Sequence, residues 1–278
     1  MTGYNFRGLG RFLRRSFFGH RGTNYRLTAK RLGVLLLSLA IYIPVEVIIW
    51  IGLGLDELIY PGYRKVQVQE PVFIIGNPRS GTTFLHRLLA RDRGHFVSMK
   101  TWEIFLAPSV VMRRLIRGLA KVIRTLGFPI RRALRRWERD IQQENVTHQV
   151  RLRGPEEDEY LWIHLFSALK IWSFAGMVEE TDPFVFFEPK QKENMLDFYH
   201  RCLQRHLYAL DAEDKKYLAK NPNFSPMVDS LLEEFPEARF IYLVRDPAEA
   251  VPSHLSLKEQ EWQLLGSPLE PYASRDFI

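Results

Sequence analysis

The stretch FIIGNPRSGTTFLHRLLA, residues 73–90, restricts the possible folds more than any other part of this 278-residue chain. The apolar residues 72–75 predict a short buried strand, and residues 82–91 predict a helix. Four apolar side chains are expected on one face of that helix: Phe84, Leu85, Leu88 and Leu89. The loop between the two elements combines glycines, a proline, an arginine and three hydroxyl side chains. A loop of this kind at a helix N-terminus presents backbone N–H groups to phosphate or sulfate, so the motif predicts an anion site in an α/β fold.

The loop GNPRSGTT is similar to the nucleotide-binding pattern GxxxxGK[ST], but Thr82 stands where that pattern has its lysine. A nucleotide hydrolase or kinase needs this lysine on the β- and γ-phosphates, and it needs an acidic strand end for magnesium. Neither feature is evident in the sequence. A P-loop-like hydrolase or kinase therefore stays an alternative function, and the fold that we expect is a P-loop-like parallel sheet flanked by helices.

A second apolar run, FIYLVR at 240–245, predicts another strand that ends at Arg245, and Ser253 follows eight residues later. Because the carboxyl ends of parallel strands meet at one edge of a sheet, we expect Arg245 to lie near the loop. A guanidinium and a hydroxyl suit a second, separate phosphate. The structural alternative for Arg245 is a salt bridge with Asp246.

These two segments, PRSGTT and LVRDPAEAVPSHLSL, resemble the cofactor signatures of the sulfotransferases that use 3′-phosphoadenosine-5′-phosphosulfate (PAPS). Further motifs are similar to the bacterial branch of this family: NPRSGTTFLHRLLA, TWE, GPEEDE and KNPNFSPMVDSLLEEFPEARFIYLVRDP. The protein tyrosine sulfotransferases are more distantly similar, through an RSGTT loop. The resemblance covers residues 70 to about 260. It implies an enzyme that moves a sulfuryl group in line from PAPS to an acceptor hydroxyl or amine, with no metal.

The resemblance also implies the cofactor residues. Arg79 would be the cation of the first loop, which would hold the 5′-phosphosulfate through backbone and hydroxyl groups of Ser80, Gly81, Thr82 and Thr83. Arg245 and Ser253 would hold the 3′-phosphate, and their spacing matches that of the family.

Lys220 ends the apolar run YLAK just before the turn signal Asn221-Pro222. It is similar to the lysine that the tyrosine sulfotransferases place against the bridging oxygen of the donor. A cation at a strand end can stabilise the charge that develops on the leaving group. A solvated surface lysine is the alternative.

Glu103, in KTWE, is the candidate general base, because it lies 24 residues after Arg79 and related branches with a glutamate base have a similar spacing. A partly desolvated carboxylate beside the acceptor is a competent base. The alternative is a helix cap or a surface ion pair with Lys100. His148 and His164 are rival bases, each expected to be an ordinary helix residue.

The segment GPEEDEYLW, which begins at Gly154, predicts the acidic start of a helix. Glu156 and Glu157 are expected to interact with the positive end of the helix dipole rather than to act in catalysis. Residues 171–190 are rich in Trp, Phe and Met, and they fit an acceptor pocket and a packed core equally well.

The N-terminal part predicts membrane association. Residues 1–31 carry eight Lys or Arg side chains and no acid, and the next 24 residues are mostly apolar apart from Pro44 and Glu46. A helix at 32–60 is long enough to span a bilayer. Interfacial anchors are expected where it leaves the membrane, at Tyr60, Tyr63, Arg64 and Lys65. Alternatively, the helix breaks at Pro44 and Glu46 and re-emerges on the same face of the membrane. A buried helix of a soluble protein is the third possibility.

A second basic segment, 113–139, contains ten Lys or Arg side chains and one acid, with apolar residues at helical spacing. It belongs to a helical lid that we expect at 105–150. Such a face fits an anionic membrane surface, an acidic acceptor or plain solvent. The net charge of +7 alone would allow nucleic acid, but no nucleic-acid-binding fold accompanies the charge. We expect a membrane partner and a hydroxyl-bearing acceptor that is amphiphilic or lipid-linked.

Three parts are therefore expected: the basic segment 1–31, a transmembrane or monotopic helix at 32–60 and a sulfotransferase domain at 70–278. Family members continue beyond the 3′-phosphate helix, so we expect a shortened member or a fragment. The enzyme would work at the cytoplasmic face of the membrane in a bacterium, or in the Golgi lumen of a eukaryote. A non-catalytic, membrane-tethered nucleotide-binding protein is the remaining alternative.

Overall fold

The structure is a computed structural model, and it describes residues 3–18, 25–127, 136, 151–169, 171 and 188–265. The chain forms two compact units. The first unit comprises Met1–Val47, Glu159–Tyr199 and Asp246–Ile278, and the second comprises Ile48–Asp158 and His200–Arg245. Each unit is assembled from segments far apart in the sequence, so the linear division into three parts stays a prediction.

Some of the predicted features lie outside the described residues. These are His148, the second half of the lid expected at 105–150, and most of the aromatic segment 171–190.

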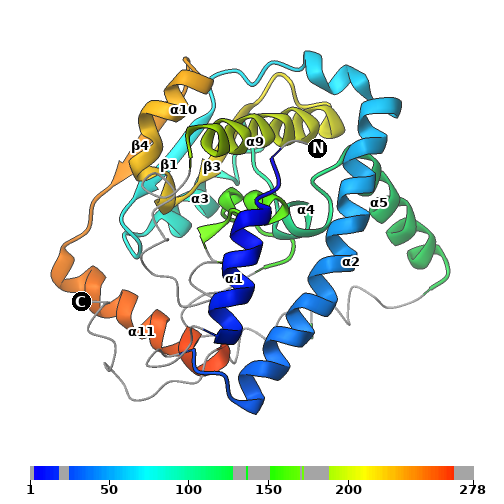
Figure 1. Cartoon of the computed structure of the whole chain (residues 1–278). Helices are drawn as coiled ribbons and strands as arrows, with labels where there is room; N and C mark the ends of the chain where they lie inside the picture. The colour runs from blue at the N-terminus through cyan, green and yellow to red at the C-terminus, as the bar shows by residue number, and fades with distance from the viewer. Residues whose placement is uncertain are drawn as a thin grey trace. The chain divides into compact units, whose positions relative to one another are not determined.

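The second unit contains a parallel sheet with the strand order β2-β3-β1-β4. The strands are β1 (Val72–Gly76), β2 (Phe96–Val97), β3 (Lys216–Lys220) and β4 (Arg239–Leu243). Figure 1 shows β1 between β3 and β4. β1 is buried along its whole length, as is usual for an inner strand of a parallel sheet. The predicted α/β fold with a parallel sheet is confirmed, and so are the two strands expected from sequence.

The strand register brings three carboxyl ends to one edge of the sheet. Ile74 of β1 is level with Lys220 of β3 and with Ile241 of β4. The chain leaves β1 at Gly76, where φ is +141° and an added Cβ would lie 2.3 Å from the carbonyl oxygen of Leu243. Glycine at this position therefore allows β1 and β4 to pair up to the point where the loop begins.

Helix α3 (Thr82–Leu89) follows the loop and packs on β1 and β3. The core between them is formed by Val72, Ile74, Leu85, Leu89 and Leu218. The prediction of a single apolar face is wrong for the other two residues, because Phe84 is 74% exposed and Leu88 is 50% exposed. Each is one residue, or about 100°, away from the leucines that face the sheet. Thr82 and His86 occupy the buried side of α3 instead.

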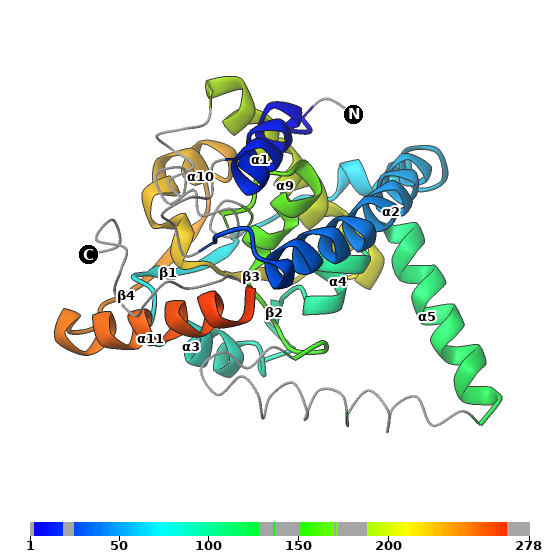
Figure 2. The same ribbon diagram turned by 60° about the horizontal axis from the view of Figure 1, so that its bottom comes forward.

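The second unit also contains several helices around the sheet. They are η1 (Pro61–Lys65), α4 (Thr101–Leu106), α5 (Val110–Thr125), η4 (Pro222–Met227), α10 (Val228–Glu234) and the C-terminal half of α9 (Pro189–Leu210). In Figures 1 and 2, α5 points away from the strands.

The first unit contains α1 (Phe6–Phe18), α11 (Pro247–Leu265), most of η2 (Asp158–Leu165) and the first part of α2 (Ala29–Ile59). Its core includes a group of rings around Phe166, with centroid distances of 5.4 Å to Phe12 and 5.8 Å to Tyr42. Buried Trp162 donates its indole N–H to the Met195 carbonyl oxygen at 2.9 Å.

Helix α2 runs through Pro44 as one continuous helix, so the predicted alternative of a break at Pro44 and Glu46 is wrong. Contacts on both sides of the proline hold the helix. Tyr42 Oη donates to the Ile163 carbonyl oxygen at 2.9 Å, and Glu46 Oε1 lies 2.8 Å from His164 Nδ1. These contacts favour a straight path over a break that would separate Tyr42 and Glu46 from their partners.

Candidate active site

The loop at residues 77–81 joins β1 to α3 at the carboxyl edge of the sheet. Arg79 has φ +68° and Gly81 has φ +92°. A non-glycine residue in this region costs energy, and such residues concentrate at functional sites. Ser80 closes the turn, because its Oγ donates to the Asn77 carbonyl oxygen at 2.6 Å. Helix α3 begins after Gly81 without a side-chain cap, so its first turn offers backbone N–H groups to an anion.

Arg245, two residues beyond β4, reaches this loop as the sequence predicted. Its Nη1 donates to the carbonyl oxygen of Arg79 at 3.0 Å. Asp246, the predicted alternative partner, accepts a hydrogen bond from the N–H of Ala248 at 2.9 Å at the start of α11. The guanidinium of Arg245 therefore lies beside the backbone of the anion loop.

Ser253, the predicted companion of Arg245, lies on α11 in the first unit. Its role as a ligand of the 3′-phosphate stays a prediction.

Lys220, the last residue of β3, is buried, so the alternative of a solvated surface lysine is wrong. Its Nζ donates to Thr83 Oγ1 at 3.2 Å and lies 2.5 Å from Glu157 Oε1. One ammonium group thus contacts the first turn of α3 and a carboxylate from a distant segment.

The Glu157 carboxylate is a site residue that sequence reasoning missed. We expected Glu157 to serve the dipole of a helix, but it pairs with Lys220 next to the anion loop. Backbone contacts fix its segment, because Glu156 N–H donates to the Met99 carbonyl oxygen at 3.2 Å. On the other side, Tyr217 Oη donates to Asp158 Oδ2 at 3.0 Å. Lys220 and Glu157 are too far apart in the sequence for a local pattern to pair them.

Glu103, the predicted base, is fully buried and belongs to a different polar cluster. Its Oε2 accepts a hydrogen bond from the N–H of Lys100 at 2.9 Å, in a capping box at the start of α4. Its Oε1 lies 3.4 Å from Arg117 Nη2 and 3.8 Å from Lys100 Nζ. The capping alternative is therefore present in the structure, but buried rather than on the surface. The role of Glu103 as the base stays a prediction.

Two buried histidines near these clusters, His86 and His206, have lowered pKa values. Burial, and then the charge of Lys220, lower the pKa of His86 to about 3. His86 Nε2 lies 3.2 Å from Ser98 Oγ and 3.3 Å from the Leu218 carbonyl oxygen. Burial, and then the charge of Arg113, likewise hold the pKa of His206 well below its ordinary value. His164, a rival base, is buried against Glu46 in the first unit.

The geometry at the sheet edge favours chemistry on an anion. Arg79, Lys220 and Arg245 gather there with the hydroxyl of Thr83 and the uncapped first turn of α3. Cations held in place can neutralise charge as it develops on a leaving oxygen. Within the described ranges, no three His, Cys, Asp or Glu side chains are grouped to hold a metal ion.

Comparison with known proteins gives a consistent result. A sequence profile of the sulfotransferase family matches residues 71–275. Two curated relatives, from Mycobacterium bovis and Mycobacterium tuberculosis, are named omega-hydroxy-beta-dihydromenaquinone-9 sulfotransferase Stf3. Each is 29% identical over 220 residues, which is 77% of this chain and 52% of the relative. The chain thus spans about half the length of the curated relatives that it matches.

Two solved structures have a similar fold. Sulfotransferase STF1 from Mycobacterium tuberculosis matches with a TM-score of 0.68 and 21% identity, over 94% of this chain and 66% of that protein. Sulfotransferase STF9 from Mycobacterium avium matches with a TM-score of 0.55 and 25% identity, over 77% of this chain and 52% of that protein. At 21% identity, the likeness to STF1 shows the fold alone.

Proposed function

Because the chain belongs to the sulfotransferase family, we propose that it transfers a sulfuryl group from PAPS to a hydroxyl group of an acceptor. One observation supports this most strongly. The buried ammonium of Lys220 lies 3.2 Å from Thr83 Oγ1, at the start of the helix that follows the anion loop. A cation there suits the bridging oxygen between sulfur and phosphorus, where charge develops during transfer.

The donor would bind along the carboxyl edge of the sheet. The N–H groups of the first turn of α3, with Arg79, Ser80, Thr82 and Thr83, would hold the 5′-phosphosulfate. Arg245 and Ser253 would hold the 3′-phosphate, as the resemblance implies. The contact of Arg245 with the Arg79 carbonyl oxygen supports this division, because it brings a second cation to the loop.

The transfer would follow an in-line course. The acceptor oxygen forms a bond to sulfur while the bond from sulfur to the bridging oxygen breaks, and the acceptor proton passes to a carboxylate. The other product is the adenosine 3′,5′-bisphosphate PAP, whose new phosphate charge Lys220 and Arg79 would neutralise. Fixed cations supply this stabilisation without a metal ion.

We assign the base role to Glu103 and the orienting role to Glu157. The spacing from Arg79 supports Glu103. The 2.5 Å contact with Lys220 Nζ supports Glu157 as the group that holds the ammonium toward the loop.

The acceptor that we propose is an amphiphilic or lipid-linked alcohol. The curated relatives are named for a menaquinone derivative with a hydroxyl group. In this chain, Phe84 and Leu88 form an exposed apolar pair on α3, the helix that begins at the anion loop. An apolar surface beside the site of transfer suits an acceptor with a hydrocarbon chain. We propose that the enzyme works at a membrane, on the side where PAPS is available.

Thermal unfolding with added nucleotides tests the cofactor. PAP at about a hundred times its Kd should stabilise the protein by about 2.7 kcal/mol, or roughly 5–10 °C in Tm. Arg245→Ala should abolish this shift. Arg91→Ala, which removes an exposed arginine at the other end of α3, should keep it.

Three outcomes would change the assignment. Stabilisation by Mg-ATP alone would favour the hydrolase or kinase. Stabilisation by PAP without transfer of label from PAPS to any hydroxyl acceptor would favour the non-catalytic binding protein. No response to PAP in the full chain would contradict the proposed function.

A further inference from the structure

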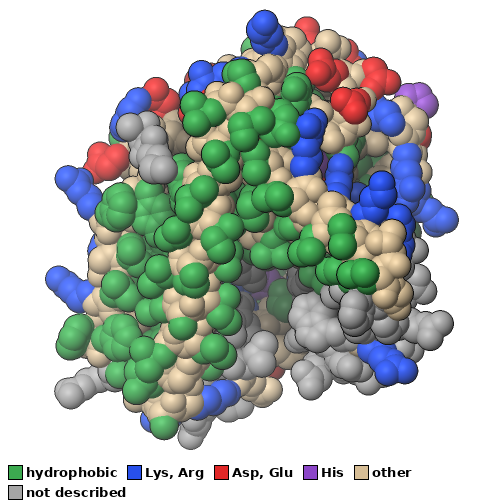
Figure 3. Space-filling view, turned by 90° about the vertical axis from the view of Figure 1, so that its right-hand side faces the viewer, with side chains coloured by type: hydrophobic (Ala, Val, Ile, Leu, Met, Phe, Trp, Pro, Cys, Tyr) green, Lys and Arg blue, Asp and Glu red, His purple; other side chains and the backbone are tan. Residues whose placement is uncertain are grey.

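Helix α2 presents an apolar face to solvent along its length. It is long and apolar enough to cross a membrane, by length and composition. On this face, Leu37 is 64% exposed, Ile51 is 57% exposed and Leu58 is 79% exposed. Figure 3 looks onto this side of the molecule and shows hydrophobic side chains gathered over α2. An exposed apolar surface of this extent marks an interaction site.

The opposite side of α2 is packed against protein. Buried or half-buried residues recur there every three or four positions: Arg31, Leu35, Leu39, Tyr42, Glu46, Ile49, Leu53 and Asp56. Such spacing defines one stripe along the helix. From Arg31 to Asp56 the stripe runs for about 38 Å at 1.5 Å per residue, which exceeds the ~30 Å hydrocarbon core of a bilayer.

Polar partners occupy this stripe in the first unit. Glu46 pairs with His164, and Tyr42 donates to the carbonyl oxygen of Ile163. Both partners lie on η2, next to the buried core residue Trp162. The middle of α2 is therefore held by a folded, partly polar element rather than surrounded by lipid.

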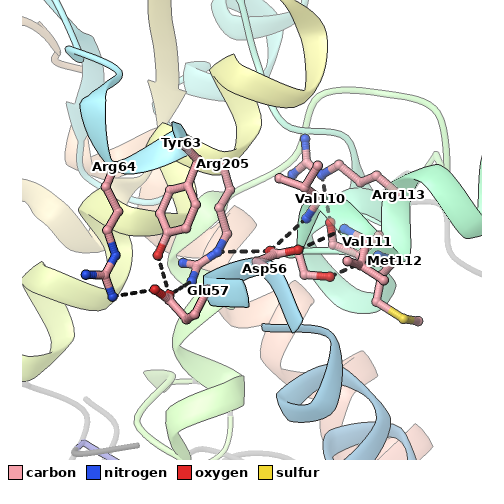
Figure 4. A network of polar contacts seen from close by, with 11 residues as sticks. Asp56, Glu57, Tyr63, Arg64, Val110, Val111, Met112, Arg113 and Arg205 are labelled. Carbon is pink, nitrogen blue, oxygen red and sulfur yellow. Dashed lines mark hydrogen bonds and ion pairs between the residues drawn. The ribbon is translucent and has the colours of Figure 1, made fainter. Parts of the chain in front are cut away.

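Polar partners also hold the end of α2 in the second unit (Figure 4). The Asp56 carboxylate accepts hydrogen bonds from the N–H groups of Val110 and Val111 at 2.9 Å each, and from Arg205 Nε at 3.0 Å. The carboxylate thus takes two of the unsatisfied N–H groups at the start of α5. Beside it, Glu57 accepts from Arg205 Nη2 at 2.7 Å.

Of the four residues expected as exit anchors, Tyr63 does not fit that role, whereas Arg64 and Lys65 are exposed. Tyr63, which we expected at the membrane interface, is fully buried, and its hydroxyl donates to Glu57. The Arg205 guanidinium lies 4.1 Å from the centroid of the Tyr63 ring. This end of α2 is thus built into the second unit.

Helix α5 carries a second apolar stripe that faces solvent. Its members are Leu115, Leu119, Val122 and Leu126, each more than half exposed and spaced by three or four residues. Exposed Arg114 and Lys121 lie on one side of this stripe, and exposed Arg124 lies on the opposite face of the helix. An apolar stripe with cations on the other faces is typical of a helix that lies in the interface of an anionic membrane.

These observations exclude a simple crossing of the membrane by α2. If α2 crossed the membrane, the elements packed on its buried stripe would also lie in the hydrocarbon region. These elements are η2, whose His164 pairs with Glu46, and the start of α5, whose N–H groups bind Asp56. Charged and irregular elements are costly there. Among the residues that the structure describes, the outward apolar face has no such partners, so this face can enter lipid while the packed stripe faces the protein.

We propose that α2 lies in the plane of one leaflet of an anionic phospholipid bilayer, and that the apolar stripe of α5 also binds an anionic bilayer. The protein is then a monotopic membrane protein. The N-terminal basic segment 1–31 adds charge of the sign that such a surface attracts. This inference rests on the packing of α2 and α5, and it holds whatever the catalytic chemistry is.

Depth measurements on α2 test the orientation. Single spin labels would be placed at Leu37→Cys, Val47→Cys and Leu58→Cys, with Glu213→Cys as the label exposed to water; the native Cys202 is buried. Leu37 and Leu58 are about 30 Å apart along the helix. In vesicles of phosphatidylcholine with phosphatidylglycerol, we expect all three α2 labels at a similar shallow depth, roughly 5–10 Å below the headgroups. A deepest label at Val47, with Leu37 and Leu58 at opposite surfaces, would overturn the proposal.

Vesicle binding tests α5. Leu119→Glu should weaken vesicle binding roughly 10- to 100-fold, because it removes a leucine side chain that would be buried in the lipid. Ala120→Glu adds the same charge beside the stripe, so it should weaken binding to anionic vesicles about fivefold or less. On vesicles of phosphatidylcholine alone, Leu119→Glu should still weaken binding and Ala120→Glu should not.

Two controls keep these outcomes distinct. Stabilisation by PAP should be unchanged in Leu119→Glu, and Val122→Ser is a milder variant if the glutamate impairs folding. If both apolar variants bind vesicles like the unmodified protein, the proposal is wrong for α5. If Leu119→Glu instead splits a dimer, as measured by light scattering, the stripe binds a second copy of the chain.

Discussion

Two regions of the second unit each pair a glutamate with Lys or Arg side chains, and the two regions differ in the sequence separation between the glutamate and its partners. At the sheet edge, Glu157 meets Lys220 beside the anion loop. In the α4–α5 cluster, Glu103 caps its own helix and contacts the neighbouring Lys100 and Arg117. The residue that sequence singled out has mostly local contacts, whereas the residue beside the loop was overlooked. A local motif can thus identify a candidate carboxylate, such as Glu103, but it does not show which distant side chain a carboxylate contacts, as Glu157 contacts Lys220.

The largest expected effect separates the two glutamates directly. If Glu103 is the base, Glu103→Gln lowers kcat by about 10²–10⁴ and removes the acidic limb of the pH–rate profile, because proton transfer is lost. Glu157→Gln should lower kcat less and keep that limb. Transfer of label from PAPS to an alcohol acceptor, measured across pH, checks both. The reverse pattern would move the base role to the sheet edge.

Lys220→Met is expected to have the next largest effect. Loss of a cation from the leaving group should lower kcat by about 10²–10³, or roughly 2.7–4 kcal/mol in the barrier. PAP binding, followed by thermal shift, should weaken much less than kcat falls. The matched change in the other cluster, Lys100→Met, should leave kcat within a few-fold. If Lys220→Met and Lys100→Met lowered kcat equally, the sheet edge and the Glu103 cluster would not differ in their importance for catalysis.

Acid should destabilise the sheet-edge region through His86. The folded pKa is about 3, below the ordinary value of 6.5, so the unfolded state binds the proton more tightly. Stability is then complete above about pH 6.5 and falls as the pH is lowered toward 3. Between about pH 7.5 and pH 5, we expect a loss of about 2 kcal/mol from this residue.

Urea midpoints at the two pH values measure this loss, and His86→Gln should reduce it. His206 has a pKa shifted in the same direction, so the Glu103 cluster should show an acid loss of the same sign. If the difference between the urea midpoints at the two pH values were the same in His86→Gln as in the unmodified protein, the loss of stability in acid would not come from His86.

The smallest effect concerns the rim of the Glu103 cluster. The Arg117 side chain is 42% exposed, so its ion pair with Glu103 is screened by water. Arg117→Ala should therefore cost about 0.2–1 kcal/mol of unfolding free energy. Breaking the buried pair through Lys220→Ala should cost several-fold more. Urea unfolding of both variants measures the difference, and similar costs would mean that burial does not separate the two pairs.

Two of the four strands, β1 and β4, and one half of the candidate site could be predicted from the sequence. The strand, loop and helix around Arg79 are contiguous, and each is specified by its own apolar period and turn residues. Arg245 was expected at the same edge because it follows a second apolar run, and parallel strands share their carboxyl edge. The exposure of Phe84 and Leu88 was not predicted, because periodicity does not show which side of a short helix meets the sheet.

The order of residue types was enough to predict a strand, a glycine-containing loop and a helix in an α/β fold, with a long apolar helix before them. Those features are local. Tertiary structure alone decided that Glu157 holds Lys220, and that Glu46 and Asp56 face protein while the leucines of α2 face outward. The reason is that each of these partners is distant in sequence. Only the packing of separate segments determines which polar groups meet and which apolar face is left exposed.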